Sequence, residues 1–371
     1  MLMKKLGFGC MRLPMQSKKK IDIDLFREMV DAAMSLGFNY FDTAYRYCKG
    51  MSEPALKEVL VDRYPREAYI LTTKLTNEFM KSEEEQAFIF EEQLKRLGQE
   101  SGYFDYYLIH NQSTVNYAVS KELKSFEFAR EKKKEGFIKH IGISFHDTAD
   151  VLERILSEQP DIEVVQLQIN YLDWENESIQ SKKCYEVARA HGKRIFVMEP
   201  LKGGTLARVS DDVMELLSSD GHTMTPAEWG LKFAASLDGV DIVLSGMNSM
   251  EMQIENMSSL DGFDKLNKEE MALVLMAGKL IEKQVSIPCT ACGYCKEECP
   301  KDIPIPEYLK LVQDKHNTTQ VVYYYNYTLE HGRAGDCIKC GLCEKHCPQH
   351  IKIRDELEKI SKAYDFFKGW R

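Results

Sequence analysis

Two identically spaced cysteine frames in the last quarter of the chain constrain its folding more than any other feature. The first frame is Cys289-x2-Cys292-x2-Cys295-x3-Cys299-Pro, and the second repeats it as Cys337-x2-Cys340-x2-Cys343-x3-Cys347-Pro. Thiolates at this spacing are typical ligands of cubane iron–sulfur clusters. The two frames therefore predict a small domain organised around two [4Fe–4S] clusters.

The fourth cysteine of each frame is expected to serve the other cluster, as in two-cluster ferredoxins. With this crossing, one cluster is held by Cys289, Cys292, Cys295 and Cys347, and the second by Cys337, Cys340, Cys343 and Cys299. Zinc is the competing interpretation, because Cys-x2-Cys pairs also form tetrahedral zinc sites. Two complete frames, each followed by Pro, favour the clusters, and a disulfide scaffold is less favoured still.

Length and charge narrow the class of protein further. At 371 residues the chain exceeds one typical domain, and every frame cysteine follows residue 288. We therefore expect a large domain at 1–283 and a cluster domain at 284–371. The net charge of −9 argues against a nucleic-acid partner. The absence of a signal peptide or a bilayer-spanning apolar run, together with reduced thiols, indicates a cytoplasmic protein without a membrane partner.

Short β-rich segments alternate with longer amphipathic segments through the first 280 residues. The expected strands are Lys5–Cys10, Phe38–Thr43, Ala68–Lys74, Phe104–His110, Lys139–Ser144, Val164–Ile169, Arg194–Glu199 and Val240–Ser245. Expected helices include 25–36 and 83–97, the second with Phe88, Ile89, Leu94 and Leu97 on its buried face. Eight strand–helix repeats predict an α/β fold of the (β/α)8 TIM type, followed by a small ferredoxin-like iron–sulfur domain.

Polar residues interrupt the expected strands at their C-terminal ends, where TIM-type barrels gather catalytic groups. These residues are Asp42, Lys74, His110, Ser144, Gln166 or Asn170, Glu199 and Ser245. Buried parallel strands are otherwise nearly continuous apolar runs, so the pattern predicts an active site at this end of the barrel. A Rossmann turn at Gly7-Phe8-Gly9 is disfavoured because the third Gly and the helix that should follow are missing.

Several of these segments resemble the aldo/keto reductase superfamily. The matching blocks are FDTAYRY at 41–47, TTKL at 72–75, YYLIHN at 106–111, IGIS at 141–144, and Ser245-Gly246 followed by Glu255-Asn256. The resemblance covers about residues 1–260. With the cysteine frames, the whole chain resembles the branch of this superfamily that carries a C-terminal ferredoxin-like 4Fe–4S domain.

The resemblance implies a catalytic tetrad formed by Asp42, Tyr47, Lys74 and His110, with the family's Asp-to-Tyr spacing selecting Tyr47 over Tyr45. Carbonyl reduction needs a proton donor, and a free phenol has a pKa of about 10. A neighbouring ammonium favours the phenolate and suits the phenol to acid catalysis. Each residue alone also has a plain structural interpretation, such as rim packing, a snorkelling Lys or a core His. The joint occurrence of the four residues in the family's order favours the functional interpretation.

The resemblance also implies a nicotinamide cofactor, either NADH or NADPH. The family's nicotinamide contacts match Ser144 and Gln166, its adenine contacts match Glu255 and Asn256, and Gly9, Ser245 and Gly246 belong to the same site. Phe145 stands where many members have Asn. Met252 and Gly246 stand where many members have basic residues, so little preference for NADPH is expected.

The leading hypothesis is an oxidoreductase that reduces an aldehyde, ketone or related unsaturated small molecule with nicotinamide, coupled to two [4Fe–4S] clusters. Clusters pass single electrons whereas nicotinamide exchanges a hydride; no flavin motif is evident, although a flavin is not excluded. One alternative is a reductase fed by a ferredoxin- or flavodoxin-type partner and largely independent of nicotinamide. Another is a non-catalytic electron-transfer or redox-sensing module, which the intact tetrad disfavours.

Overall fold

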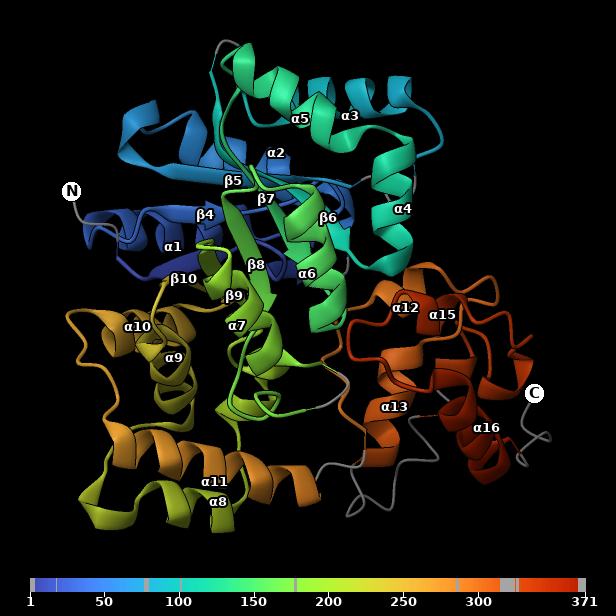
Figure 1. Ribbon diagram of the computed structural model, residues 1–371. Coiled ribbons are helices and arrows are strands. Elements are labelled where there is room, and N and C mark those ends of the chain that lie inside the picture. Colours follow the sequence, from blue (N-terminus) through green and yellow to red (C-terminus); the bar gives the residue numbers. More distant parts are fainter. Residues whose placement is uncertain are drawn as a thin grey trace.

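Eight parallel strands close into a barrel surrounded by helices (Figure 1). The computed structural model describes residues 4–17, 19–76, 80–100, 102–176, 179–284, 287–313, 324 and 327–365. The barrel strands are β1 (Leu6–Gly9), β4 (Tyr40–Asp42), β5 (Ile70–Leu75), β6 (Phe104–Gln112), β7 (Ile138–Phe145), β8 (Val164–Gln168), β9 (Arg194–Met198) and β10 (Val240–Ser245). They are ordered β1-β10-β9-β8-β7-β6-β5-β4 around the barrel. The predicted (β/α)8 fold is confirmed.

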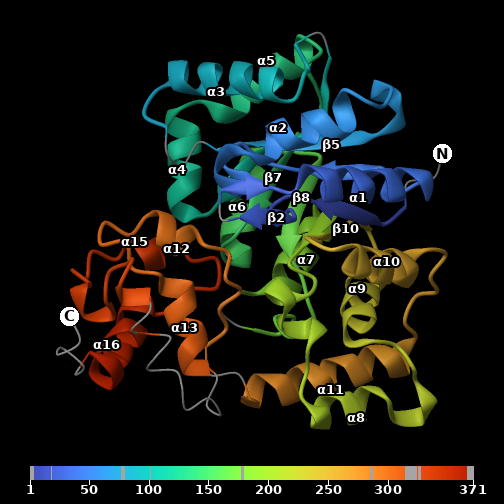
Figure 2. The same cartoon turned by 180° about the vertical axis from the view of Figure 1, so that it is seen from behind.

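Helices connect the barrel strands and cover the outside of the barrel in both views (Figures 1 and 2). They are α1 (Ile23–Ser35), α2 (Ser52–Leu56), α3 (Glu83–Arg96), α4 (Thr114–Glu122), α5 (Ser125–Lys134), α6 (Ala149–Glu158), α7 (Ser181–Ala190), α8 (Asp211–Leu217), α9 (Pro226–Ser236), α10 (Met250–Leu260) and α11 (Lys268–Gln284). Shorter turns are the 3-10 segments Tyr47–Gly50, Arg66–Ala68, Lys202–Ala207 and Ser219–Gly221, and the π-helical Lys57–Val61. A small antiparallel hairpin, β2 (Met15–Ser17) and β3 (Lys20–Ile21), precedes α1 and was not expected from the sequence.

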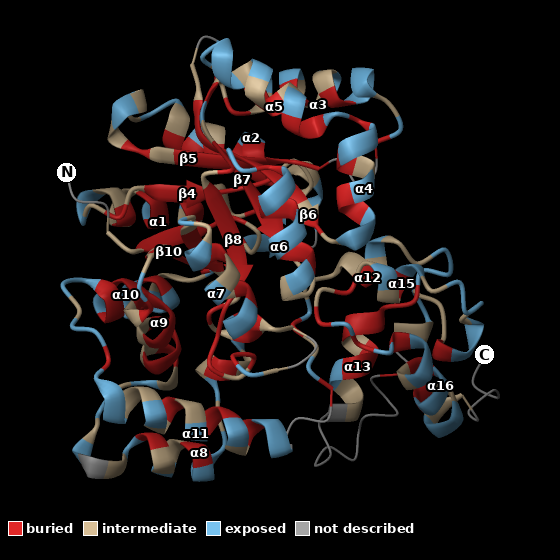
Figure 3. Ribbon diagram, viewed as in Figure 1, coloured by how far each residue is buried: buried red, intermediate tan, exposed pale blue. Residues whose placement is uncertain are grey.

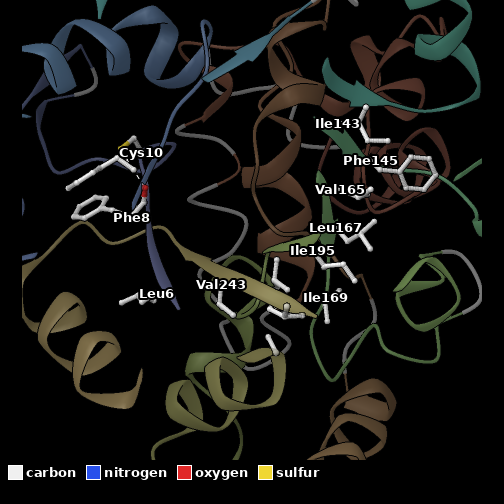
Figure 4. Close-up of a cluster of buried hydrophobic side chains, with 14 of the residues drawn as sticks. Leu6, Phe8, Cys10, Ile143, Phe145, Val165, Leu167, Ile169, Ile195 and Val243 are labelled. Atoms are coloured by element: carbon white, nitrogen blue, oxygen red, sulfur yellow. Dashed lines mark hydrogen bonds between the residues drawn. The ribbon is translucent and has the colours of Figure 1, made fainter. Parts of the chain in front are cut away.

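Alternating strand residues face two separate apolar layers, because successive side chains of a strand point to opposite faces. Tyr40, Leu108 and Phe196 belong to the cluster that fills the barrel interior. Their strand neighbours, such as Phe41, pack in the larger layer beneath the helices. Figure 4 draws part of this outer layer on β1 and β7–β10, and Figure 3 shows the strands as the most buried part of the molecule. The filled interior closes the barrel below the predicted site.

The predicted buried face of α3 is correct in part, since Leu94 and Leu97 are buried as expected. Phe88 is 59% exposed, whereas Phe90 and Gln93 are buried. Gln93 is polar, but its amide is fully used: it donates to Glu53 Oε1 at 2.8 Å and accepts from the Tyr107 hydroxyl at 2.8 Å. The buried face of the helix therefore extends to glutamines that an apolar pattern does not detect.

The C-terminal part forms a small domain beside the barrel (Figures 1 and 2). Its elements are α12 (Tyr294–Glu297), α13 (Ile305–Gln313), the 3-10 turn Ala334–Asp336, α15 (Leu342–Lys345) and α16 (Ile353–Tyr364). Its core is separate from that of the barrel and includes Tyr308 and Tyr324, whose ring centroids are 4.5 Å apart. The boundary at 283/284 stays a prediction. It falls beside the end of α11 at Gln284.

Direct polar contacts join the two parts of the molecule. Arg12 Nη2 donates to the carbonyl oxygen of Thr290 at 2.9 Å, and Arg46 pairs with Glu297 at 3.2 Å. Gly203 has a φ of +66°, and a Cβ there would lie 2.5 Å from the same Thr290 oxygen. Only glycine combines that backbone conformation with so close an approach. Within the ranges described above, no helix is both long enough and apolar enough to cross a membrane.

Candidate active site

A cavity of about 420 Å³ opens at the C-terminal ends of the barrel strands. Of the barrel residues predicted to form the site, all but Lys74 line this cavity: Gly9, Asp42, Tyr47, His110, Ser144, Gln166, Ser245, Gly246, Glu255 and Asn256. They come from strands and loops far apart in sequence. The parallel barrel brings them together because its strands all end at one face.

Lys74 lies behind the cavity in a buried ion pair with Asp42. Its Nζ atom is 2.5 Å from Asp42 Oδ1 and also donates to the Thr43 carbonyl oxygen at 2.9 Å. Gln166 Nε2 donates to the second Asp42 oxygen at 3.0 Å. Burial raises the pKa of Asp42 and lowers that of Lys74, and their mutual attraction opposes both shifts. These hydrogen bonds favour an ammonium and a carboxylate held in fixed positions.

Tyr47 and Tyr45 follow β4 closely but have different environments. Tyr47 lines the cavity, and the Lys74 Nζ atom is 4.7 Å from the centre of its ring. The Tyr45 ring is instead stacked with Arg96 of α3, whose guanidinium carbon is 4.0 Å from the ring centroid. Arg96 also donates to the Tyr45 hydroxyl at 3.2 Å. Tyr47, and not Tyr45, is therefore placed beside the buried cation.

The His110 ring contacts the Tyr47 ring edge to face in the cavity wall, with ring centroids 6.1 Å apart. Burial, followed by the nearby Lys74 charge, lowers the pKa of His110 well below its ordinary value. The imidazole is therefore neutral near pH 7, with one N–H donor and one acceptor nitrogen. Its Nδ1 atom is 3.3 Å from Thr76 Oγ1. A neutral ring in this position suits hydrogen bonding to a substrate oxygen.

One cavity residue of the β7 end was missed in the sequence. Phe145 packs in the outer apolar layer (Figure 4), but the next residue, His146, lines the cavity. His146 is partly buried, burial lowers its pKa to about 4, and its buried Nδ1 atom has no hydrogen-bond partner among the described residues. An unpaired buried polar atom facing a cavity is a ready contact for a bound polar group. Ser144 already accepts a hydrogen bond from the Asn111 backbone N–H at 2.7 Å.

The predicted nucleotide end of the cavity contains cations that local sequence comparison did not reveal. Asn256 Nδ2 donates to Ser245 Oγ at 2.9 Å, which fixes both side chains. The side chain of Arg12 lies beside Gly246, with its Cβ 3.5 Å from where a glycine Cβ would be. Arg208 also lines the cavity, is exposed, and makes no hydrogen bond or ion pair with any described part of the chain. Both arginines lie outside residues 245–256, where the family's basic residues were expected.

The eight frame cysteines surround two separate small voids in the C-terminal domain. One void is lined by Cys289, Cys292, Cys295 and Cys347, and the other by Cys299, Cys337, Cys340 and Cys343. Each set thus combines three thiols of one frame with the last thiol of the other. Across the described residues, no three His, Cys, Asp or Glu side chains are grouped closely enough for a single metal ion. Four sulfurs spread around a void suit a larger polynuclear group.

The first thiol set reaches the barrel cavity itself. Cys292, Tyr294 and Pro348 line the same cavity as Tyr47 and His110. The second set lies farther out, and its Cys340 is exposed. A cluster on the first set would therefore form part of the wall of the active site. No local sequence signal predicted this, because it depends on how the two domains dock.

The fold and these sites define an oxidoreductase, and the chain belongs to the aldo/keto reductase family, whose model matches residues 5–275. The 4Fe-4S dicluster domain model matches residues 288–352. The predicted family and cluster domain are thereby confirmed.

Similar proteins agree with this family membership. An uncharacterised oxidoreductase of Bacillus subtilis (YqkF) is 25% identical over 72% of this chain and 90% of its own length. The 7-acetyl-epi-neemfruitin B aldo-keto reductase of Melia azedarach is 27% identical over 72% of this chain and 82% of its own. Among solved structures, the holo form of an aldo-keto reductase from Bacillus halodurans aligns with a TM-score of 0.60 and 26% identity, covering 74% of this chain and 91% of that one.

Proposed function

We propose that this protein is a nicotinamide-dependent carbonyl reductase of a reducing cytoplasm whose active site is coupled to two [4Fe–4S] clusters. The observation that carries the proposal is the shared cavity. Asp42, Tyr47 and His110 line it from the barrel, and Cys292 lines it from the cluster domain. Hydride chemistry and one-electron chemistry would then meet in one enclosed space.

The barrel residues have separate roles in this reaction. His110, neutral because of its burial, donates a hydrogen bond to the substrate carbonyl oxygen. Tyr47 supplies the proton to that oxygen, and Lys74, held by Asp42, favours the phenolate that remains. Ser144, Asn256 and Arg208 are the candidates for holding the nucleotide. Bound nicotinamide would supply the hydride.

The two thiol sets are the proposed cluster sites, with the crossed ligands described above. Each [4Fe–4S] cluster exchanges one electron, so two clusters together match the two electrons of one hydride. The exposed Cys340 favours a second candidate function, in which a ferredoxin- or flavodoxin-type partner delivers electrons at the outer cluster. Electrons would then pass through the inner cluster to a small carbonyl or unsaturated substrate in the cavity.

Titration of the anaerobically reconstituted protein with NADH and NADPH, while cluster absorbance is followed, tests the proposed coupling. We expect at least one nucleotide to bleach the cluster absorbance, because Cys292 lines the cavity that would hold it. Nucleotide binding without bleaching would contradict coupling and leave ordinary hydride chemistry. Bleaching by a reduced ferredoxin, with no binding of either nucleotide, would favour the second candidate.

Arg208 provides a prediction about nucleotide preference. A charge-assisted hydrogen bond contributes roughly 1.5–3 kcal/mol, and Arg208 is a cation that lines the cavity and pairs with no described part of the chain. Replacing it by Met is expected to weaken NADPH binding about tenfold, equivalent to about 1.4 kcal/mol, while NADH affinity changes little. Fluorescence titration of both nucleotides measures this difference. Equal weakening of both would assign Arg208 to the pyrophosphate that they share.

A further inference from the structure

A buried ion pair lies where the barrel meets the first thiol set. Lys202 Nζ is 2.6 Å and 2.7 Å from the two carboxylate oxygens of Asp173, and both side chains are only 2% exposed. Asp173 follows β8, and Lys202 follows β9. Neither residue lines the active-site cavity. A buried ion pair is tolerated only when further hydrogen bonds satisfy both charges. The surrounding residues therefore have to supply these partners.

The cluster domain supplies one of those partners, Gln349. Lys202 Nζ donates to Gln349 Oε1 at 2.6 Å, and Gln349 Nε2 donates to Gln168 Oε1 at 3.1 Å. Gln168 Nε2 in turn donates to Asp173 at 2.8 Å. Gln349 is 5% exposed and stands two residues after Cys347. The network therefore connects the ion pair to the chain segment that carries one of the proposed ligands.

We propose that the Lys202–Asp173 pair positions the inner cluster at the active-site wall and that its two charges shift the reduction potential of that cluster in opposite directions. The inference deepens the proposed function and rests on it, because it takes Cys289, Cys292, Cys295 and Cys347 as the ligands of that cluster. Lys202 and Asp173 are positioning residues: they act through Gln349 and through their charges. Neither contacts the reacting atoms.

The direction of the electrostatic effect follows from charge alone. Reduction adds negative charge to a cluster, so a nearby cation favours the reduced state and a nearby anion opposes it. Gln349, which accepts a hydrogen bond from Lys202 Nζ, lines the same void as Cys289 and Cys347, so the buried pair lies next to the proposed cluster site. In the intact pair the opposite effects of the two charges on the reduction potential largely cancel. Removal of either one leaves the other buried and close to the cluster.

Single and double variants of the pair test the proposal. In Asp173→Asn the remaining ammonium is expected to raise the inner-cluster potential. In Lys202→Met the remaining carboxylate keeps its hydrogen bonds from Gln168 and Asn170, both at 2.8 Å, and is expected to lower it. Each shift should change the reduction equilibrium at least tenfold, which is about 59 mV for one electron. The double variant should return toward the wild-type value.

The measurement is an anaerobic potentiometric titration monitored by electron paramagnetic resonance, with iron and sulfide content determined for each variant. Arg66→Met is the matched control, because it breaks an ion pair with Asp105 at the opposite end of the barrel. It should leave both cluster potentials unchanged. The proposal is supported if the inner-cluster potential shifts in opposite directions in the two single variants.

Two other outcomes would overturn the inference. In the first, both single variants bind both clusters, but the inner-cluster potential is unchanged or shifts in the same direction in both. The ion pair would then have no such role, while the proposed function would still stand. A wild-type protein without iron and sulfide would remove the proposed function together with the inference. If Lys202→Met does not incorporate clusters, Asp173→Asn still decides the sign of the effect.

Discussion

Replacing Tyr47 by Phe is expected to lower carbonyl turnover by at least the ~100-fold that follows loss of a positioned general acid. Tyr47 lines the cavity beside His110, with the Lys74 ammonium 4.7 Å from its ring centre. The Phe ring keeps the same packing but has no proton to transfer. Nucleotide affinity should change little, because the phenol hydroxyl is assigned to the substrate. Steady-state turnover with an aldehyde panel and nucleotide titration measure the two effects separately.

Tyr45→Phe is the matched control for this variant. The Tyr45 hydroxyl accepts a hydrogen bond from Arg96 at 3.2 Å, and its ring stacks on that guanidinium. Phe keeps the stacking and loses one partly exposed hydrogen bond, so turnover should stay close to that of the wild type. If turnover fell equally in the two variants, neither Tyr45 nor Tyr47 would be the general acid. Both substitutions would then act by disturbing the segment between β4 and α2.

The barrel could be predicted because its signal is local and repeated. Each buried parallel strand is a short apolar run, and most of these strands end in a polar residue at the face where the cavity lies. The β2–β3 hairpin gave no such signal, since residues 15–17 are all exposed and carry no apolar alternation. The buried glutamines of α3 were missed for a related reason. Gln86 and Gln93 are buried through specific hydrogen bonds, which hydropathy does not report.

The convergence of the predicted site residues followed from the barrel, but two other features of the site could not be predicted. Cys292 reaches the cavity only because the domains dock, through contacts such as that between Arg12 and Thr290. The contact between Arg12 and Thr290 joins residues 278 positions apart. No sequence pattern singles out Lys202, because its burial depends on Asp173 and Gln349 together. Contacts between distant segments carry no periodicity that a sequence pattern could detect.

The crossed pairing of the cysteines predicts the loss of a whole cluster when one ligand is replaced. Wild-type protein purified anaerobically should contain about eight iron and eight sulfide per chain, as two [4Fe–4S] clusters require. Cys299→Ala and Cys347→Ala should each lose about half, because each removes the fourth ligand of one cluster. Stoichiometric zinc without sulfide would exclude both proposed cluster sites.

Alkylation of the two variants under native anaerobic conditions, followed by mass spectrometry, identifies which cluster each has lost. Thiols that still bind a cluster are protected, whereas free thiolates react. Since Cys299 lines a void with Cys337, Cys340 and Cys343, Cys299→Ala should expose those three to alkylation and leave the first frame protected. Cys347→Ala should do the reverse, and because Cys292 lines the cavity, it should also abolish nucleotide-dependent bleaching. If alkylation instead modified the frame that carries the substitution, each frame would hold its own cluster, and the crossed assignment would be wrong.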